Sequence, residues 1–265
     1  MRNARCIAKM NGRNPAIDEG TEKKLTGDSY LRLPTTIDER GAMSQPSQQP
    51  RRFSTRLLVA ITASGVVAFT VLAGLVASHW PWLLAGDQAA DNAAHRDVLT
   101  QPWLLVGART ATAIGSPAVV DVVAAIAVVA LLVLRWWCYA VVVAVARVGE
   151  LVCESVVKMV VARPRPELVH PVASASGYSF PSGHAGGSAA LYGALALLGL
   201  TWAARWARLV LVAAATLVVC AVAASRVLLG VHYPSDVAAG IALGVACVSG
   251  AALVVRLLAT AAPAS

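Results

Sequence analysis

Six long apolar runs, separated by short polar stretches, dominate the chain beyond residue 56. Each run is long enough, at about 1.5 Å per residue, to cross the roughly 30 Å of hydrocarbon in a bilayer. The backbone of such runs must be helical, because lipid offers it no hydrogen bonds. The pattern therefore predicts an all-α polytopic membrane protein, a six-transmembrane-helix bundle. The predicted helices cover roughly residues 57–78, 114–134, 136–162, 184–204, 207–225 and 236–258.

Composition agrees with this interpretation. The chain is 57% hydrophobic and 14% charged, whereas a soluble domain is about 25% charged. Eleven of its 22 Lys and Arg residues fall within residues 1–56, where six acids are interleaved with them. We therefore interpret residues 1–55 as a disordered basic cytoplasmic tail and residues 56–260 as the membrane domain. The tail has no basic block or aromatic platform, so we expect no nucleic-acid partner. Met43 is an alternative start that leaves a short basic lead.

Basic residues at the ends of the runs predict the orientation. With six crossings, four arginine-bearing places fall on one side of the membrane: the tail, the connection between the second and third runs, the connection between the fourth and fifth runs, and the end of the sixth run. The positive-inside rule assigns this side to the cytoplasm. Both termini are then cytoplasmic. The longest connection, residues 79–113, lies outside; we expect part of it to lie on the membrane surface as a short helix, with no readable function. The arginines used are Arg51, Arg52, Arg56, Arg135, Arg205, Arg208 and Arg256.

Three short polar clusters stand at the ends of the apolar runs. Ionisable groups beside hydrocarbon are costly and usually functional. Alternating passes bring the end of the third predicted helix and the starts of the fourth and sixth to the same outer face, so we expect the clusters to meet there. The clusters are Lys158 with Arg165-Pro166; Pro181-Ser182-Gly183-His184; and Ser225-Arg226 with His232 and Asp236.

The residue types in these clusters suit the cleavage of a phosphate ester. Three cations, Lys158, Arg165 and Arg226, can neutralise the phosphate. Ser182 is a capping candidate at a helix start, where free N–H groups favour an anion, and Gly183 lets that anion approach closely. One neutral histidine can attack phosphorus while the other protonates the leaving oxygen.

The spacing of the histidines divides these two tasks between them. His232 and Asp236 are four residues apart, a spacing that lets the carboxylate fix the imidazole tautomer. We therefore expect His232 to be the nucleophile, assisted by Asp236, and His184 to be the general acid.

The three clusters together resemble the three-part motif of the type 2 phosphatidic acid phosphatase family, which shares its site with the vanadium-dependent haloperoxidases. Every defining position is present between residues 158 and 236. The resemblance implies metal-independent hydrolysis of lipid phosphates or diphosphates at the outer leaflet, without a cofactor. It implies phosphate binding by Lys158, Arg165, Ser182, Gly183 and Arg226, and catalysis by His232, His184 and Asp236. No acidic cluster of the magnesium-binding type accompanies the motifs.

Several alternatives stay open. Phosphatidic acid and related glycerolipid phosphates are the first choice of substrate, and undecaprenyl diphosphate, the carrier recycled in cell-wall synthesis, is the second. A haloperoxidase-like oxidoreductase or a non-catalytic lipid-binding protein could use the same anion pocket. The hydrophobic spans argue against the first, and the presence of both motif histidines argues against the second. The sequence does not give the oligomeric state.

Some polar residues lie outside the motifs. Arg147, Glu150, Glu154 and Lys158 follow one face of the third predicted helix, which favours ion pairs inside the bundle between Arg147 and Glu150 and between Glu154 and Lys158. In a second interpretation Glu154 orients Lys158 for phosphate. Asp121 is a lone acid for which Arg147 is the candidate partner. We expect His79, His95 and His170 at the surface, and close helix packing at Gly240-x-x-x-Gly244.

Overall fold

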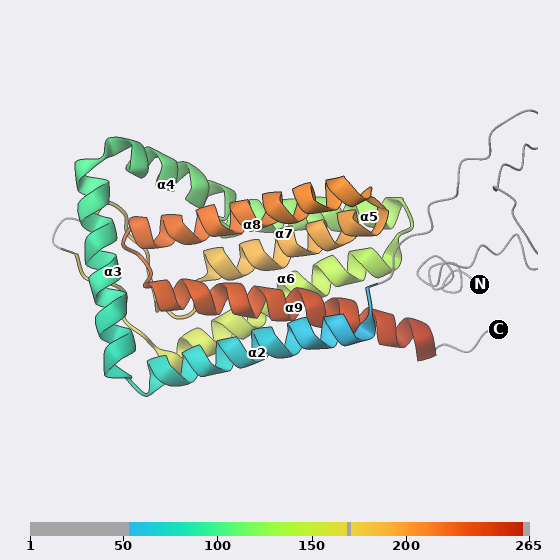
Figure 1. The fold of residues 1–265 in the computed structure, drawn as a ribbon, viewed down its shortest axis with the longest axis horizontal. Coiled ribbons are helices and arrows are strands. Elements are labelled where there is room, and N and C mark those ends of the chain that lie inside the picture. The colour runs from blue at the N-terminus through green and yellow to red at the C-terminus, as the bar shows by residue number, and fades with distance from the viewer. Residues whose placement is uncertain (1–52, 169–170, 262–265) are drawn as a thin grey trace, which may run out of the picture.

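The computed structural model describes residues 53–168 and 171–261, which form eight α-helices and no strand (Figure 1). The predicted tail, apart from its last three positions, lies outside these residues. Met43 and His170 also lie outside them. The division at residue 55 therefore stays a prediction. The helices are α2 (Thr55–Ala77), α3 (Pro81–Thr100), α4 (Pro102–Ile114), α5 (Pro117–Val133), α6 (Trp137–Val161), α7 (Gly183–Trp202), α8 (Arg205–Leu228) and α9 (Pro234–Ala261).

The predicted all-α membrane architecture is confirmed. Helices α2, α5, α6, α7, α8 and α9 begin and end within a few residues of the six predicted runs and lie side by side (Figure 1). Five segments are long and apolar enough to span a membrane. They are Thr55–Ala77, Pro102–Val133, Gly183–Trp202, Arg205–Leu228 and Pro234–Thr260.

Helix α6 is not among these five segments, and it carries four charged side chains. Arg147 lies 2.7 Å from Asp121 of α5 and 2.6 Å from Glu150. One turn further on, Lys158 pairs with Glu154. Both predicted ion pairs are therefore present, as is the Asp121 partner. Pairing of this kind lets a charged helix lie inside a bundle, where an isolated charge would be too costly.

Helix α9 lies at the centre of the bundle, in contact with α2, α6 and α7. It approaches α7 closely at the predicted pair of glycines. A Cβ atom at Gly240 would overlap the carbonyl oxygen of Ser182, and one at Gly244 would overlap that of Gly186. The small-residue spacing thus brings the start of α7 against the start of α9, where two of the polar clusters lie.

The connection between the first two predicted spans is the main difference from expectation. Instead of a loop with one short helix, it consists of α3 and α4, and α3 runs across one end of the bundle (Figure 1). Asp87, Asp91 and His95 recur every four residues on α3 and are all buried. The expectation that His95 lies at the surface was wrong, because this polar face of α3 is turned inward; His79 is exposed as expected.

Candidate active site

All three polar clusters meet at the end of the bundle that α3 crosses. The backbone N–H of Ser182 donates to the Asp236 carbonyl at 3.0 Å, which joins the second cluster to the third. Arg165 of the first cluster reaches His232 of the third. Lys158, Arg165, Arg226 and His232 all lie close enough to His184 to influence its imidazole electrostatically. The structure therefore brings the sequence-predicted residues together at one site, while their individual roles stay predictions.

The surroundings of His232 indicate its protonation state. Nη1 of Arg165 lies 3.1 Å from its Nε2. A guanidinium can only donate, so Nε2 accepts and the ring proton lies on Nδ1. Nδ1 faces Oδ2 of Asp236 at 3.5 Å, which is too long for a good hydrogen bond. Burial lowers the pKa of His232 to about 4, although Asp236 acts in the opposite direction. The ring is thus neutral near pH 7, with a lone pair on Nε2.

Asp236 is held from both sides. Its Oδ1 accepts from Nη1 of Arg163 at 2.6 Å, and its Oδ2 accepts from the backbone N–H of Tyr233 at 3.0 Å. Arg163 also donates to Asp87 of α3 at 2.8 Å. The sequence alone assigns no role to Arg163 or Asp87. The only signals for them were the position of Arg163 inside the first motif and the four-residue spacing of polar residues from Asp87 onward.

The start of α7 presents an unpaired hydroxyl. Ser182 occupies the N-cap position, as predicted, but its side chain makes no capping hydrogen bond. The capping prediction was wrong in that respect, and the buried Oγ has no partner. A Cβ atom at Gly183 would overlap the carboxylate of Glu154. Gly183 therefore lets Glu154, together with its partner Lys158, approach the N-terminus of α7.

Two of the three arginines at the site, Arg165 and Arg226, lack carboxylate partners among the described residues. Arg226 is 7% exposed; its Nη1 donates to Thr112 at 2.6 Å, and its Nε has no partner. Arg165 donates to backbone carbonyls, and burial lowers its pKa. Its acceptors are Ser176, Gly177, Tyr178 and Val231. The two guanidinium groups are therefore cations without a carboxylate counter-ion nearby, an arrangement that favours an anion.

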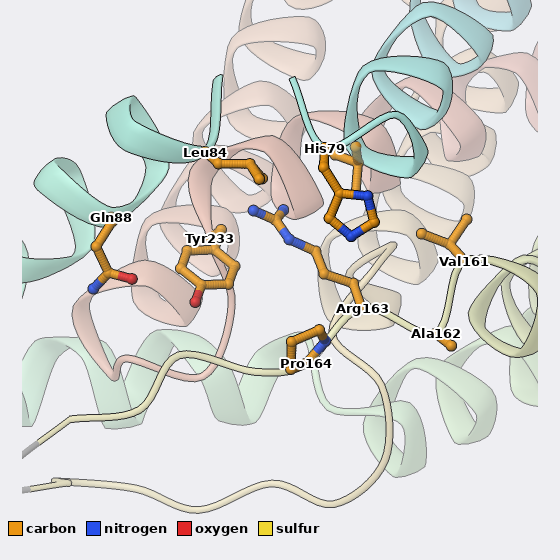
Figure 2. A pocket seen from close by; sticks show the side chains of 9 residues that line it. His79, Leu84, Gln88, Val161, Ala162, Arg163, Pro164 and Tyr233 are labelled. Carbon is orange, nitrogen blue, oxygen red and sulfur yellow. The ribbon is translucent and has the colours of Figure 1, made fainter. Parts of the chain in front are cut away.

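A cavity of about 300 Å³ lies beside the site (Figure 2). Arg163 and Tyr233 form one wall, with the guanidinium 4.1 Å from the centre of the phenol ring. Arg163 also binds Asp236, so this residue connects the cavity to the catalytic cluster. Within the described residues, no three His, Cys, Asp or Glu side chains are placed to hold a metal ion.

Residues 135–259 match the PAP2 superfamily. The matched region contains all three polar clusters. Curated relatives from two strains of Mycobacterium tuberculosis, each named decaprenylphosphoryl-5-phosphoribose phosphatase, are 40% identical over 108 residues. Those residues are 38% of this chain and 54% of the relative, so the chain matches about half the length of these relatives.

A solved structure of a PAP2 protein shares the fold. It is described as the first transmembrane PAP2 type phosphatidylglycerolphosphate phosphatase from Bacillus subtilis. The superposition gives a TM-score of 0.60 at 24% sequence identity and covers 75% of this chain and 94% of the other. The PAP2 match begins at residue 135, so Asp87, α3 and α4 precede it.

Proposed function

We propose that this protein is a membrane phosphatase that hydrolyses phosphomonoesters or diphosphates of lipids without a metal ion. One observation carries the proposal. A neutral imidazole, whose Nε2 accepts from Arg165, lies beside two arginines that have no described carboxylate partner, the half-buried Arg165 and the buried Arg226. Such a site is electrostatically incomplete until an anion binds, and a phosphate group supplies both the charge and an electrophilic atom.

The reaction then proceeds in two steps. Arg165, Arg226 and Lys158 bind the phosphate oxygens, with Arg165 exchanging its contact to His232 for one to the phosphate. Nε2 of His232 attacks phosphorus and forms a phosphohistidine, while His184 gives a proton to the leaving lipid oxygen. Asp236 stabilises the positive charge that develops on the imidazole.

Water completes the second step. With His184 now acting as the base, a water molecule attacks the phosphohistidine and releases inorganic phosphate. His232 returns to its neutral form and His184 regains its proton. Ser182 and the N–H groups at the start of α7 stabilise the phosphate oxygens in both steps. No oxidant or cofactor is needed for this sequence.

Phosphatidic acid and related glycerolipid phosphates are the first substrates to test. The names of the similar proteins widen the list, because one is a phosphatase of a decaprenyl-linked phosphoribose and the other of phosphatidylglycerolphosphate. Undecaprenyl diphosphate stays the alternative among diphosphates. In each of these lipids the phosphate is joined to a long apolar anchor, which suits a site at the end of a membrane bundle.

We assign the site to the outer membrane face. This assignment is supported by the opposite end of the bundle, where Arg135 joins α5 to α6 and Arg205 begins α8. Arg56 at the start of α2 and Arg256 near the end of α9 lie at that end as well. Basic residues of this kind collect on the cytoplasmic side of membrane proteins.

The decisive experiment measures phosphate release from a panel of these lipids by the full-length protein, in EDTA. We expect release from at least one lipid, and a fall of about 10⁴-fold or more in His232→Ala, because the nucleophile is lost. Arg96→Gln is the control, since Arg96 is exposed and lies outside the three motifs and the lining of the cavity. It should retain full activity.

Two further readouts separate the alternatives. With ³²P-labelled lipid, rapid quenching in base should trap a label on the wild type that is stable in base, lost in acid and absent from His232→Ala. Absence of phosphate release from every lipid would contradict the proposal. Vanadate should compete with the substrate, whereas vanadate-dependent halogenation with peroxide would instead identify an oxidoreductase.

A further inference from the structure

Helix α3 is tied to the catalytic residues by a buried network that lies outside the three motifs. Asp87 of α3 accepts hydrogen bonds from Arg163 at 2.8 Å and from the backbone N–H of Ser235 at 3.0 Å. It also accepts from the Ser235 hydroxyl. Arg163 donates in turn to Asp236 at 2.6 Å and to Ser235 at 2.8 Å. All four side chains are buried.

The charge balance of this network gives Asp87 a specific effect on Asp236. If Arg163 paired with Asp236 alone, the cation would neutralise much of the carboxylate that faces His232. Because Arg163 is shared by two carboxylates, the pair of acids keeps a net negative charge beside the imidazole. The contact to Arg163 also fixes Oδ1, which leaves Oδ2 turned toward Nδ1 of His232.

We propose that Asp87 of α3 is a positioning residue for the hydrolysis, which holds Asp236 against His232 by sharing Arg163 with it. This inference rests on the proposed phosphatase function, and it assigns a task to α3, which precedes the region that matches the superfamily. Asp87 does not touch the substrate. It acts on the reaction only through the tautomer, orientation and charge of the dyad formed by His232 and Asp236.

Several charged groups face Asp236 from the elements around it. Arg163 and Arg165 belong to the segment after α6, Asp87 and Asp91 to α3, and His232 to the connection before α9. Of these, only Arg163 forms an ion pair with both Asp87 and Asp236 among the described residues. Replacing Asp87 by Asn therefore removes a negative charge while keeping the shape of the side chain.

The expected kinetic effect is a loss of turnover without a loss of binding. The imidazolium formed during attack is less stabilised in Asp87→Asn, so kcat should fall by about tenfold to a hundredfold, as for other groups that orient a reactive imidazole through a partner. The KM and the inhibition constant of vanadate should change by less than about threefold, since the Nε2 side is untouched. Asp97→Asn, at an exposed position on the same helix, is the control and should behave as wild type.

A second measurement does not depend on turnover. In protein labelled with ¹⁵N-histidine, the His232 resonances, assigned by their absence from His232→Ala, report its titration and tautomer. Because a negative charge is lost, the pKa of His232 should fall below its wild-type value in Asp87→Asn. The proton on Nδ1 should also be less strongly fixed. Asp97→Asn should show neither change.

The outcomes separate this inference from the proposed function. If the wild type cleaves no lipid, the proposed function fails, and the histidine titration still decides whether Asp87 acts on His232. If the wild type is active and Asp87→Asn changes neither kcat nor the titration, the positioning role is refuted. Parallel losses of vanadate binding, thermal stability and kcat, without a shift in the His232 titration, would show that Asp87 only supports the fold.

Discussion

The two sides of the His232 ring differ in how completely their polar groups are paired. On the Nδ1 side, Asp236, Arg163 and Asp87 form a closed network of hydrogen bonds and ion pairs. Nε2 itself accepts from Arg165, and elsewhere in the site the Ser182 hydroxyl and Nε of Arg226 are buried without a partner. Buried polar groups are normally satisfied, and an unpaired one needs an explanation. The paired side positions the catalytic residues, and the unpaired side is where we place the ligand.

The largest effect that this contrast predicts is at Arg226. We expect Arg226→Gln to lower kcat/KM by about 100-fold or more, because a buried cation that contacts the phosphate is lost. The affinity for vanadate should fall as well. The thermal stability of the ligand-free protein should not fall, because the substitution removes an uncompensated buried charge. Arg96→Gln on α3, where the side chain is exposed, is the control. Activity within twofold of wild type would show that Arg226 does not contact the substrate.

A smaller effect is expected at the start of α7. Gly183→Ala places a Cβ atom on the Glu154 carboxylate, so the N-terminus of α7 and the Glu154–Lys158 pair must move apart. We expect activity to fall by about tenfold, since small displacements of a binding group are costly. Gly193→Ala in the same helix meets only Val248, at 3.4 Å. It should keep full activity and gain stability, because alanine favours a helix. Equal activity of the two variants would remove Gly183 from the site.

The Glu154–Lys158 pair raises the question of whether Glu154 holds Lys158 in position to bind the phosphate. If Glu154 orients Lys158 for phosphate, Glu154→Gln should raise KM by about threefold to tenfold, as a loosened charged contact would. The alternative is an ion pair that only allows α6 to lie in the bundle. In that case KM and turnover stay unchanged in a protein that remains stable, and steady-state kinetics decides between the two.

The smallest predicted effect concerns Asp91, a buried acid near the paired network that is itself unpaired. Asp91 is fully buried, and both of its carboxylate oxygens lack a partner. Burial, and then repulsion from Asp236 and Asp87, raises its pKa from 3.8 to about 6. The Asp91 carboxyl therefore holds its proton more tightly in the folded protein than in the unfolded chain. Protonated Asp91 favours folding below about pH 4, and this contribution to stability is lost as the pH rises through about 6.

Replacing Asp91 by a neutral residue removes the free-energy cost of burying an unpaired carboxylate. We expect Asp91→Asn to raise Tm at pH 8 by about 3–8 °C, with the gain disappearing near pH 4, where the wild-type carboxyl is protonated. Thermal unfolding in detergent across this pH range measures it, and Asp97→Asn is again the exposed control. A gain in Tm that is the same at pH 4 and pH 8 would show that the Asp91 charge is not its cause.

The sequence was sufficient to predict the six long helices and the convergence of the motifs. Helix periodicity is not needed for a membrane span, because length and hydrophobicity decide it. Alternating passes then place Lys158, Ser182 and Asp236 at the same end without any knowledge of packing. The pairing of Arg147 with Glu150 follows equally from spacing along one helix.

The structure adds what spacing cannot give. Asp87 and Arg163 are 76 residues apart and meet only because α3 crosses the end of the bundle. A polar helix outside the hydrophobic runs has no membrane thickness to fix its direction, so neither its path nor its inward face was predictable. The absence of a capping bond at Ser182 depends on the local geometry at the start of α7, which residue type alone does not determine.

The ion-paired stripe of α6 also bears on how the chain enters the membrane. Arg147, Glu150, Glu154 and Lys158 would make this segment a poor candidate for insertion alone, since each charge at mid-bilayer costs about 2.5–3.5 kcal/mol on insertion scales. Asp121 of α5 is made first and supplies the counter-charge for Arg147. The two segments should therefore leave the translocon as a helical hairpin, and fragments that lack residues 117–133 should fail to retain α6 in the bilayer.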